Sequence, residues 1–358
     1  MKSAIYNPYL DTAGGGDKYM MVVAEVLSSV GEVDVLLDEH LWLQGVDYIK
    51  ERLERLHGLN LSKVNFVKAP IGYGSSFIKR IFFLHQYDCL FYLSDGSFFY
   101  STARQNIVHF QMPLDQIAVQ GIWNRVKLQT WHKAVYNSSF TKNYIEKKIK
   151  IPGEVVYPPV SVDLFKPAVK KKQILSVGRF AAHTKDKKHE VLIGVFKELS
   201  SRKDVSHWSL HLAGGMTAGD KQYVDELKKQ AKGYEIVFHP DILLKDLINL
   251  YNSSAIYWHA KGYGEDDPKK TEHFGISTVE AMAAGCVPIV INKGGQPEIV
   301  EDNYSGFLWS SLKEFKAKTI EVINNSRLRA RLSRSAVSRA HIFSKDVFVD
   351  HIRKVVNV

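Results

Sequence analysis

The chain has 358 residues, which exceeds the size at which a single hydrophobic core usually keeps growing, so we expect two domains. Apolar residues make up 45% of it, a fraction typical of a globular protein and too high for a disordered one. No apolar run approaches the roughly 18–20 residues that cross a bilayer, and the first residues do not read as a secretory signal peptide. We therefore expect a soluble, cytoplasmic protein.

The net charge of +10 is unevenly placed, because residues 60–150 carry 12 Lys or Arg against 4 Asp or Glu. A basic face suits anionic lipid, a lipid-diphosphate acceptor or nucleic acid, and a merely solvated surface explains it equally well. Trp123 and Trp131 lie among these cations and suit either a membrane interface or a helix that faces the core. We expect the core-facing helix.

The first half of the chain alternates short apolar runs with stretches of helical period. The patterns predict strands at residues 5–6, 33–37, 64–67, 89–93 and 107–110, and helices at 19–29 and 46–57. Strands that alternate with helices over short connections are typical of a parallel sheet. The first half therefore fits a doubly wound unit.

A proline-rich segment, residues 155–167, separates the two halves. It contains Pro158, Pro159 and Pro167, and proline, which lacks an N–H, suits neither a helix interior nor a central strand. We expect an extended connection between two domains, with a surface loop inside one domain as the alternative.

The second half alternates more regularly, and it also predicts a doubly wound unit. The expected strands are residues 174–177, 210–213, 236–238, 256–258, 287–291 and 306–309, and the expected helices are 188–201, 221–232, 244–252, 278–284 and 311–324. Residues 344–358 read as a last helix, with Ser344 as its N-cap.

The two cysteines could form a disulfide bond, and an acidic stretch could bind a metal ion. Cys89 and Cys286 lie among apolar residues without a Cys or His neighbour at ligand spacing, so we expect two buried free thiols. The acidic run Glu265-Asp266-Asp267 could bind a hard cation, but it reads better as a solvated loop.

The most informative segment is residues 272–285, a loop that runs into a short helix ended by Gly285. The N–H groups of Phe274, Gly275 and Ile276 should lie at the helix start, where unpaired donors and the helix dipole favour phosphate or hydroxyl oxygens. A structural alternative is a capping box with Ser277 as N-cap and Glu280 reaching back. It would not explain Glu272 or a Phe-Gly pair that we expect to be exposed.

Two further clusters suit anionic ligands. Arg179 should end the first strand of the second half, and Lys187 follows in the next loop, so both cations could neutralise a diphosphate. Near the N-terminus, Gly14, Gly15 and Gly16 precede a predicted helix, where glycine permits positive φ and a close backbone approach to phosphate.

Residues 272–285 resemble the Glu-x7-Glu motif of retaining glycosyltransferases of family four, also called glycosyl transferases group 1, and match every fixed position of E-x-F-G-x-x-x-x-E-A-M-A-x-G. Similar likenesses extend over residues 178–193, 287–300 and 14–17. His109, in the run His109-Phe110-Gln111-Met112-Pro113, resembles the family's H-x-x-P segment, with one more residue before the proline, and most closely that of eukaryotic lipid-linked mannosyltransferases.

The resemblance implies a GT-B fold: two Rossmann-like domains with an interdomain cleft. The first domain would span residues 1–163 and take back the helix at 344–358, and the second, nucleotide-sugar-binding domain would span 164–343. The implied catalytic residues are Glu272, His109, Arg179 and Lys187. The implied donor-binding residues are Gly15, Gly16, Arg179, Lys187, Phe274, Gly275, Ile276 and Glu280, with Glu280 on the ribose. The loop before Lys187 is longer than usual, so Lys185 and Lys188 remain alternatives.

The function implied is transfer of a hexose, with retention, from GDP-mannose or a UDP-sugar to a glycan or lipid-linked glycan in glycan or polysaccharide biosynthesis. No cofactor and no metal is expected, since the nucleotide-sugar is a co-substrate. Nucleic acid is not an expected partner. Peripheral association with the cytoplasmic face of a membrane could use the basic face of residues 60–150. A sugar-nucleotide epimerase of the same fold and a non-catalytic nucleotide-sugar-binding module are the alternatives.

Overall fold

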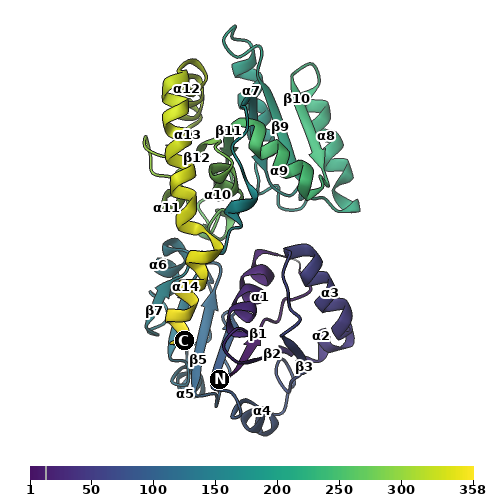
Figure 1. The fold of residues 1–358 in the computed structure, drawn as a ribbon, viewed down its shortest axis with the longest axis vertical. Coiled ribbons are helices and arrows are strands. Elements are labelled where there is room, and N and C mark those ends of the chain that lie inside the picture. Colours follow the sequence, from purple (N-terminus) through teal and green to yellow (C-terminus); the bar gives the residue numbers. More distant parts are fainter. Residues whose placement is uncertain (13) are drawn as a thin grey trace. The chain divides into compact units, whose positions relative to one another are not determined.

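The computed structural model describes residues 1–12 and 14–358. It divides into two compact units (Figure 1). Unit 1 consists of Met1–Pro159 together with Asp346–Val358, and unit 2 is Val160–Lys345. The boundary therefore falls inside the proline-rich segment.

Unit 1 is built on a parallel sheet of seven strands in the order β3-β2-β1-β4-β5-β6-β7. Its strands are β1 Lys2–Tyr6, β2 Glu32–Leu37, β3 Asn65–Lys68, β4 Cys89–Leu93, β5 Gln105–Phe110, β6 Lys133–Tyr136 and β7 Gly153–Val155. Strand order runs outward in both directions from β1 and β4, so the sheet is doubly wound, as the sequence predicts.

Helices cover both faces of this sheet, which explains why its strands are apolar on both sides. The helices are α1 Gly15–Leu27, α2 Glu39–Leu43, α3 Val46–His57, α4 Phe77–Leu84, α5 Ile122–Leu128, α6 Ser139–Ile145 and α14 Lys345–Val356. One hydrophobic cluster packs α1, α3 and α14 against the sheet. A second cluster holds Leu84 of α4, Leu128 of α5 and Ile145 of α6, so these three helices share a face.

Unit 2 contains a parallel sheet of six strands in the order β10-β9-β8-β11-β12-β13. Its strands are β8 Lys171–Val177, β9 Ser209–Gly214, β10 Ile236–Pro240, β11 Ser254–His259, β12 Val287–Ile291 and β13 Phe307–Trp309. Its helices are α7 His189–Ser200, α8 Lys221–Ala231, α9 Leu244–Ser253, α10 Ile276–Ala283, α11 Gln296–Ile299, α12 Leu312–Asn324 and α13 Ser326–Ala340. This sheet order places β8 beside β11 and β11 beside β12, so the carboxyl ends of the three strands meet at one edge.

Several local expectations need correction. The proline-rich segment is not extended throughout, because Val162–Leu164 forms a 3-10 turn. The helix at 19–29 begins four residues earlier, at Gly15. Of the two tryptophans expected to face the core, Trp131 is buried but Trp123 is 77% exposed, since α5 buries no residue completely.

The cysteine prediction is confirmed: Cys89 and Cys286 are buried free thiols. Burial raises the pKa of Cys89 to about 12 and that of Cys286 to about 11. Across residues 1–12 and 14–358, every helix is too short or too polar to cross a bilayer.

The C-terminal helix α14 should be an integral part of unit 1, because Ile352 is fully buried in its core. Ile352→Ala leaves a cavity there and should lower the free energy of unfolding by about 2–5 kcal/mol. Urea denaturation measures the change. The control is Val358→Ala, at a side chain that is 44% exposed. Equal stability of the two variants would contradict this role of α14.

Candidate active site

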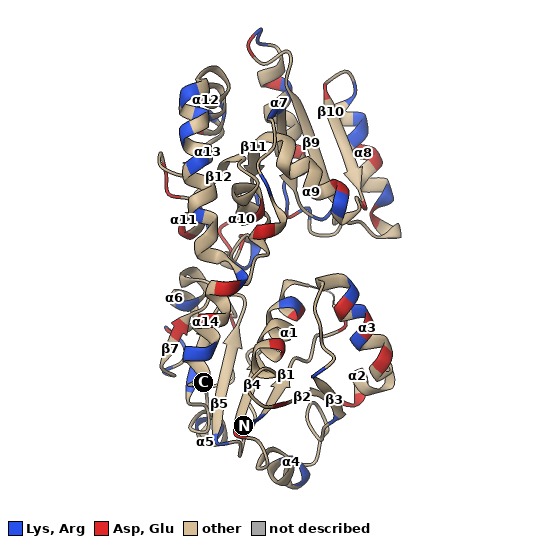
Figure 2. Ribbon diagram, in the orientation of Figure 1, with Lys and Arg blue, Asp and Glu red and all other residues tan. Residues whose placement is uncertain are grey.

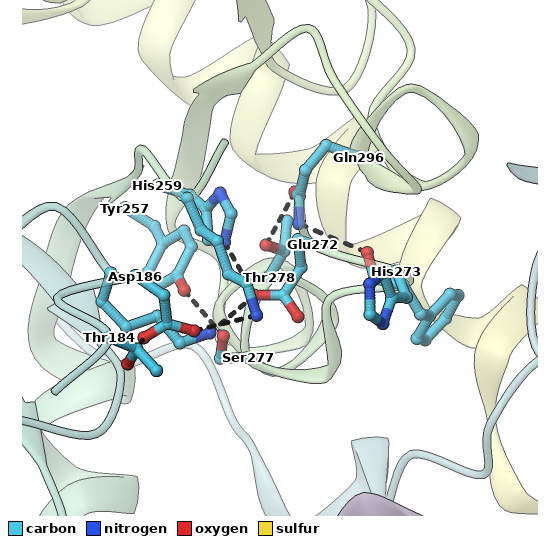
Figure 3. A network of polar contacts seen from close by, with 12 residues as sticks. Thr184, Asp186, Tyr257, His259, Glu272, His273, Ser277, Thr278 and Gln296 are labelled. Atoms are coloured by element: carbon cyan, nitrogen blue, oxygen red, sulfur yellow. Dashed lines mark hydrogen bonds and ion pairs between the residues drawn. The ribbon is translucent and has the colours of Figure 1, made fainter. Parts of the chain in front are cut away.

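The centre of the site is the carboxylate of Glu272, in the loop before α10 of unit 2 (Figure 3). Lys187 Nζ donates to Glu272 Oε2 at 2.6 Å, and His259 Nε2 lies 3.1 Å from the same oxygen. The side chains of Lys187 and Glu272 are 18% and 17% exposed. Three segments that are distant in sequence therefore meet at one oxygen atom.

His259, Lys261 and Asp186 complete this cluster, and none of the three was predicted from the sequence. His259 ends β11, and Lys261 follows it. The Lys261 Nζ pairs with Asp186 Oδ2 at 2.9 Å, so a second ion pair flanks the Glu272–Lys187 pair. A His at the end of the apolar strand β11 and a Lys just beyond it were the available signal, because ligand sites lie at the carboxyl ends of such strands.

The electrostatics keep Glu272 ionised. Burial by itself would raise the pKa of this carboxyl group. The positive charges of Lys187 and Lys261 have the larger effect and hold the pKa well below its usual value of 4.5. Burial lowers the pKa of His259 although Glu272 opposes this, so we assign a neutral ring that donates through Nε2. His259 Nδ1 is buried without a hydrogen-bond partner.

A second loop fixes the backbone around Glu272. Gly295 N donates to Glu272 O at 2.8 Å, and Gln296 Nε2 donates to Phe274 O at 3.3 Å. Thr278 Oγ1 donates to Gln296 Oε1 at 2.9 Å, which ties the loop to α10. Gly275 has φ of +126°, and a Cβ there would lie 2.3 Å from Gln296 Nε2. The backbone from Glu272 to the helix start is thus held on both sides.

Helix α10 begins earlier than the capping-box alternative requires. Its N-cap is Gly275, and its first residue is Ile276. Ser277 lies in the first turn, where its Oγ accepts a hydrogen bond from Tyr257 at 2.8 Å. Glu280 accepts one from Tyr251 at 2.9 Å. Ser277 as N-cap was therefore wrong, and so was the expectation of an exposed Phe274, which is 3% exposed.

The three candidate lysines of the β8–α7 loop have different partners. Lys187 binds Glu272, whereas Lys188 Nζ binds Glu265 Oε1 at 2.5 Å. Lys185 Nζ lies 3.8 Å from Glu190 and 5.1 Å from the centre of the Tyr223 ring, and half of its side chain is exposed. Lys187 is therefore the lysine that the structure brings to Glu272. Arg179, which follows β8, is exposed. It lies near enough to Lys261 for its positive charge to work toward a lower pKa of that lysine.

The acidic stretch is engaged in local contacts. Glu265 pairs with Lys188 and Lys270, and Asp267 caps the 3-10 turn at Pro268–Lys270. Among the residues that the structure describes, no three His, Cys, Asp or Glu side chains gather as a metal site requires.

In unit 1, the glycine-rich segment starts a helix instead of forming a free loop. Gly14 is the N-cap of α1, and its N–H donates to Asp17 Oδ2 at 3.2 Å. Gly14, Gly15 and Gly16 do not use positive φ, contrary to the expectation. A Cβ at Gly16 would lie 2.7 Å from Gln111 Oε1, so a larger residue there would displace the end of the Gln111 side chain.

His109, at the end of β5, is fully buried. Its ring stacks on Tyr19 with 3.9 Å between centroids, and its Nδ1 lies 3.0 Å from Val135 O. Since a carbonyl only accepts, Nδ1 carries the proton, and Nε2 is buried without a partner. Burial lowers the pKa of His109 to about 3, so the ring is neutral at physiological pH. This geometry positions Tyr19 and gives His109 no exposed polar atom.

The cluster in unit 2 can bind an anionic, hydroxyl-rich ligand. Lys187 and Lys261 supply positive charge, and the ionised Glu272 accepts hydrogen bonds. The start of α10 adds N–H groups and a favourable dipole beside them. A sugar joined to a diphosphate presents both kinds of partner, hydroxyl donors and phosphate oxygens.

Comparison with known proteins agrees with this chemistry. The model of the family described as Glycosyl transferases group 1 matches residues 164–339. A GDP-Man:Man(3)GlcNAc(2)-PP-Dol alpha-1,2-mannosyltransferase of Dictyostelium discoideum is 27% identical over 62% of this chain and 46% of its own length. The human protein of that name is 31% identical over 57% and 44%. A human Alpha-1,3/1,6-mannosyltransferase ALG2 is 26% identical over 62% and 57%. The chain thus spans about half the length of these curated relatives.

Solved structures share the architecture of the whole chain. A glycosyltransferase from Rickettsia africae ESF-5 superposes with a TM-score of 0.75 at 16% identity, covering 99% of this chain and 97% of its own. Anabaena Alr3699/HepE in complex with UDP and glucose gives 0.69 at 16% identity, covering 100% and 99%. The two parallel-sheet units match these structures, and the predicted GT-B fold is confirmed.

The ionised state of Glu272 has a measurable consequence for stability. Because its folded pKa lies well below 4.5, the carboxylate stabilises the fold above about pH 4.5, and this contribution is lost as the pH falls toward the folded pKa. Below pH 4.5, the wild-type chain should lose up to about 1.4 kcal/mol per pH unit more than Glu272→Gln, which takes up no proton.

Urea denaturation of both proteins at pH 7 and at successively lower pH measures this difference. The exposed Glu235→Gln serves as the control and should follow the wild type. Parallel pH profiles of the wild type and Glu272→Gln would contradict an ionised, ion-paired Glu272.

Proposed function

Because the chain belongs to the family of group 1 glycosyl transferases, we propose that it transfers a mannosyl residue from GDP-mannose to a lipid-linked glycan. The names of its relatives support the donor and the acceptor, since these proteins are called GDP-Man-dependent mannosyltransferases acting on a dolichol-linked glycan. We further propose that the transfer retains the anomeric configuration and serves glycan biosynthesis.

The observation that carries this proposal is the ionised Glu272 held by Lys187 and His259 beside the start of α10. A carboxylate that is ionised at physiological pH has no proton to donate to a leaving group. It can accept hydrogen bonds from the hydroxyls of the transferred sugar, and it favours positive charge that develops at the anomeric carbon. Glu272 therefore has the properties needed beside the sugar.

The leaving diphosphate needs cations and hydrogen-bond donors. We propose that Arg179 and Lys187 neutralise its charge, while the N–H groups of Phe274, Gly275 and Ile276 bind its oxygens. Since these groups already supply positive charge, we propose that no metal or other cofactor takes part. A phosphate oxygen can accept the proton of the attacking hydroxyl on the face from which it departs, so retention requires no protein base.

The remaining donor contacts follow the same reasoning. We propose that Glu280, oriented by Tyr251, accepts hydrogen bonds from the ribose hydroxyls. For unit 1, we propose that the backbone at Gly15 and Gly16, at the start of α1, binds the diphosphate. His109, whose ring stacks on Tyr19 of α1, then positions that helix. Two buried free thiols suit the reducing cytoplasm, which we propose as the location.

The donor is tested by thermal shift with GDP-mannose and with UDP-, ADP- and dTDP-sugars, because a ligand that binds only the folded chain raises its apparent stability. We expect stabilisation by GDP-mannose, and slow release of free mannose when acceptor is absent, with a metal chelator present throughout. A UDP-sugar as the sole hit would overturn the choice of donor. Binding without hydrolysis or transfer would favour a non-catalytic module, and release of an altered sugar would favour an epimerase.

Arg179→Ala should reduce turnover by about 10²–10³-fold, the effect typical of removing one group that stabilises transition-state charge. The control is Arg202→Ala, which removes an exposed arginine of unit 2 that pairs only locally, with Asp204. Turnover is measured on folded protein with saturating donor. Arg179→Ala at wild-type turnover would remove Arg179 from the proposed mechanism.

A further inference from the structure

Helix α4 is almost entirely apolar, yet it is poorly buried. Its sequence is Phe-Ile-Lys-Arg-Ile-Phe-Phe-Leu, and Leu84 is its one buried residue. Phe77, Ile78 and Phe82 are 53%, 65% and 76% exposed. An apolar helix face of this kind in contact with water marks either an interaction surface or a site prone to aggregation.

Helix α5 repeats the pattern on the same side of the sheet. Ile122 and Trp123 are 73% and 77% exposed, at the start of a helix in which no residue is buried. Leu84 of α4 and Leu128 of α5 pack into one hydrophobic cluster, so both helices cover the same face of the unit 1 sheet.

One short segment, residues 101–102, anchors both helices. Thr102 Oγ1 donates to Ile81 O of α4 at 2.6 Å. Ser101 N donates to Thr130 Oγ1, just beyond the end of α5, at 3.3 Å. The exposed apolar side chains of the two helices therefore belong to one region of unit 1, which Figure 1 draws at the end that carries the N-terminus.

The charged residues on these two helices and in the segments that flank them in sequence are of one sign. Residues 73–87 and 116–133 contain lysines and arginines but neither Asp nor Glu. Lys79 on α4 and Arg125 on α5 are exposed, and in Figure 2 blue but no red interrupts the tan ribbon of α4. Lys79 also lines an open pocket of about 660 Å³ with Lys68, Tyr73 and Glu39, and the Glu39 carboxylate pairs with Lys68. We call these two helices with their cations the apolar–basic face. Its members are Phe77, Ile78, Lys79, Phe82, Ile122, Trp123 and Arg125.

We propose that the apolar–basic face docks on an anionic lipid bilayer, with the aromatic and aliphatic side chains in the interfacial region and the cations among the phosphates. Tryptophan and phenylalanine beside lysine and arginine are the composition that such an interface prefers. A second copy of this chain fits less well, because a two-fold contact would bring the same cations against each other. The proposal rests on the surface of unit 1, independently of the transferase chemistry.

Co-sedimentation of the full chain with vesicles tests the proposal without donor or acceptor. We expect binding to vesicles that contain phosphatidylserine and weak binding to pure phosphatidylcholine. The double variant Phe82→Ser/Trp123→Ser should weaken binding at least about tenfold. Lys79→Gln/Arg125→Gln should weaken it roughly fivefold for each cation removed and reduce the preference for anionic lipid.

Matched controls lie elsewhere on the chain. Leu43 on α2 is as exposed as Phe82, at 76%, so Leu43→Ser should bind like the wild type. Lys313→Gln/Arg327→Gln removes two exposed cations from unit 2 and should have little effect. Donor hydrolysis by Phe82→Ser/Trp123→Ser should equal that of the wild type, which separates a failure of this inference from a failure of the proposed function.

Two results would overturn the inference. One is equal vesicle binding by the wild type and Phe82→Ser/Trp123→Ser, or no vesicle binding at all. The other is a concentration-dependent dimer that Phe82→Ser/Trp123→Ser abolishes while vesicle binding persists, because a second copy would then cover this face.

Discussion

A carboxylate removed from water must be paired, and in this protein the pairing of Glu272 organises the carboxyl edge of the second sheet. Taking an acid and a lysine out of water costs several kcal/mol, and the loss of one partner leaves the other charge uncompensated. Lys187, His259 and Glu272 therefore depend on one another for their positions. Lys261 and Asp186 add a second pair beside the first, which keeps the cluster close to neutral before any ligand arrives.

The surrounding backbone is shaped to hold that carboxylate. Gly295 and Gln296 bind the carbonyl groups on either side of His273, so the loop cannot shift without breaking hydrogen bonds at both points. Thr278 connects the same glutamine to the first turns of α10. The helix start and the acid are thus positioned by one set of contacts. The geometry of the motif at residues 272–285 therefore depends on the loop that carries Gly295 and Gln296.

The sequence predicted the doubly wound architecture and the residues that lie within continuous motifs. Apolar strands and short connections are local properties, and Glu272, Gly275 and Lys187 lie in segments with a recognisable pattern. His259 and Asp186 escaped because only the sheet order, β8 beside β11, brings their segments to Glu272. The capping-box alternative at Ser277 was wrong because a serine three residues before a glutamate looks like a cap in sequence alone. In the structure the N-cap is Gly275, and Gln296 holds the backbone there. Trp123 was misplaced because composition alone does not tell which side of a helix faces the core.

The chain enters and leaves unit 2 at neighbouring points. Val160 N donates to Phe343 O at 3.0 Å, and Lys345 N donates to Val160 O at 3.1 Å, so the incoming and outgoing segments are hydrogen-bonded to each other. Unit 2 is consequently an insertion within unit 1, whose last core helix, α14, follows it in sequence. During synthesis on the ribosome, where chains fold from the N-terminus, unit 2 can complete its core while unit 1 still lacks Ile352 and Val355. Unit 1 is therefore the first unit whose synthesis begins and the last whose core is completed.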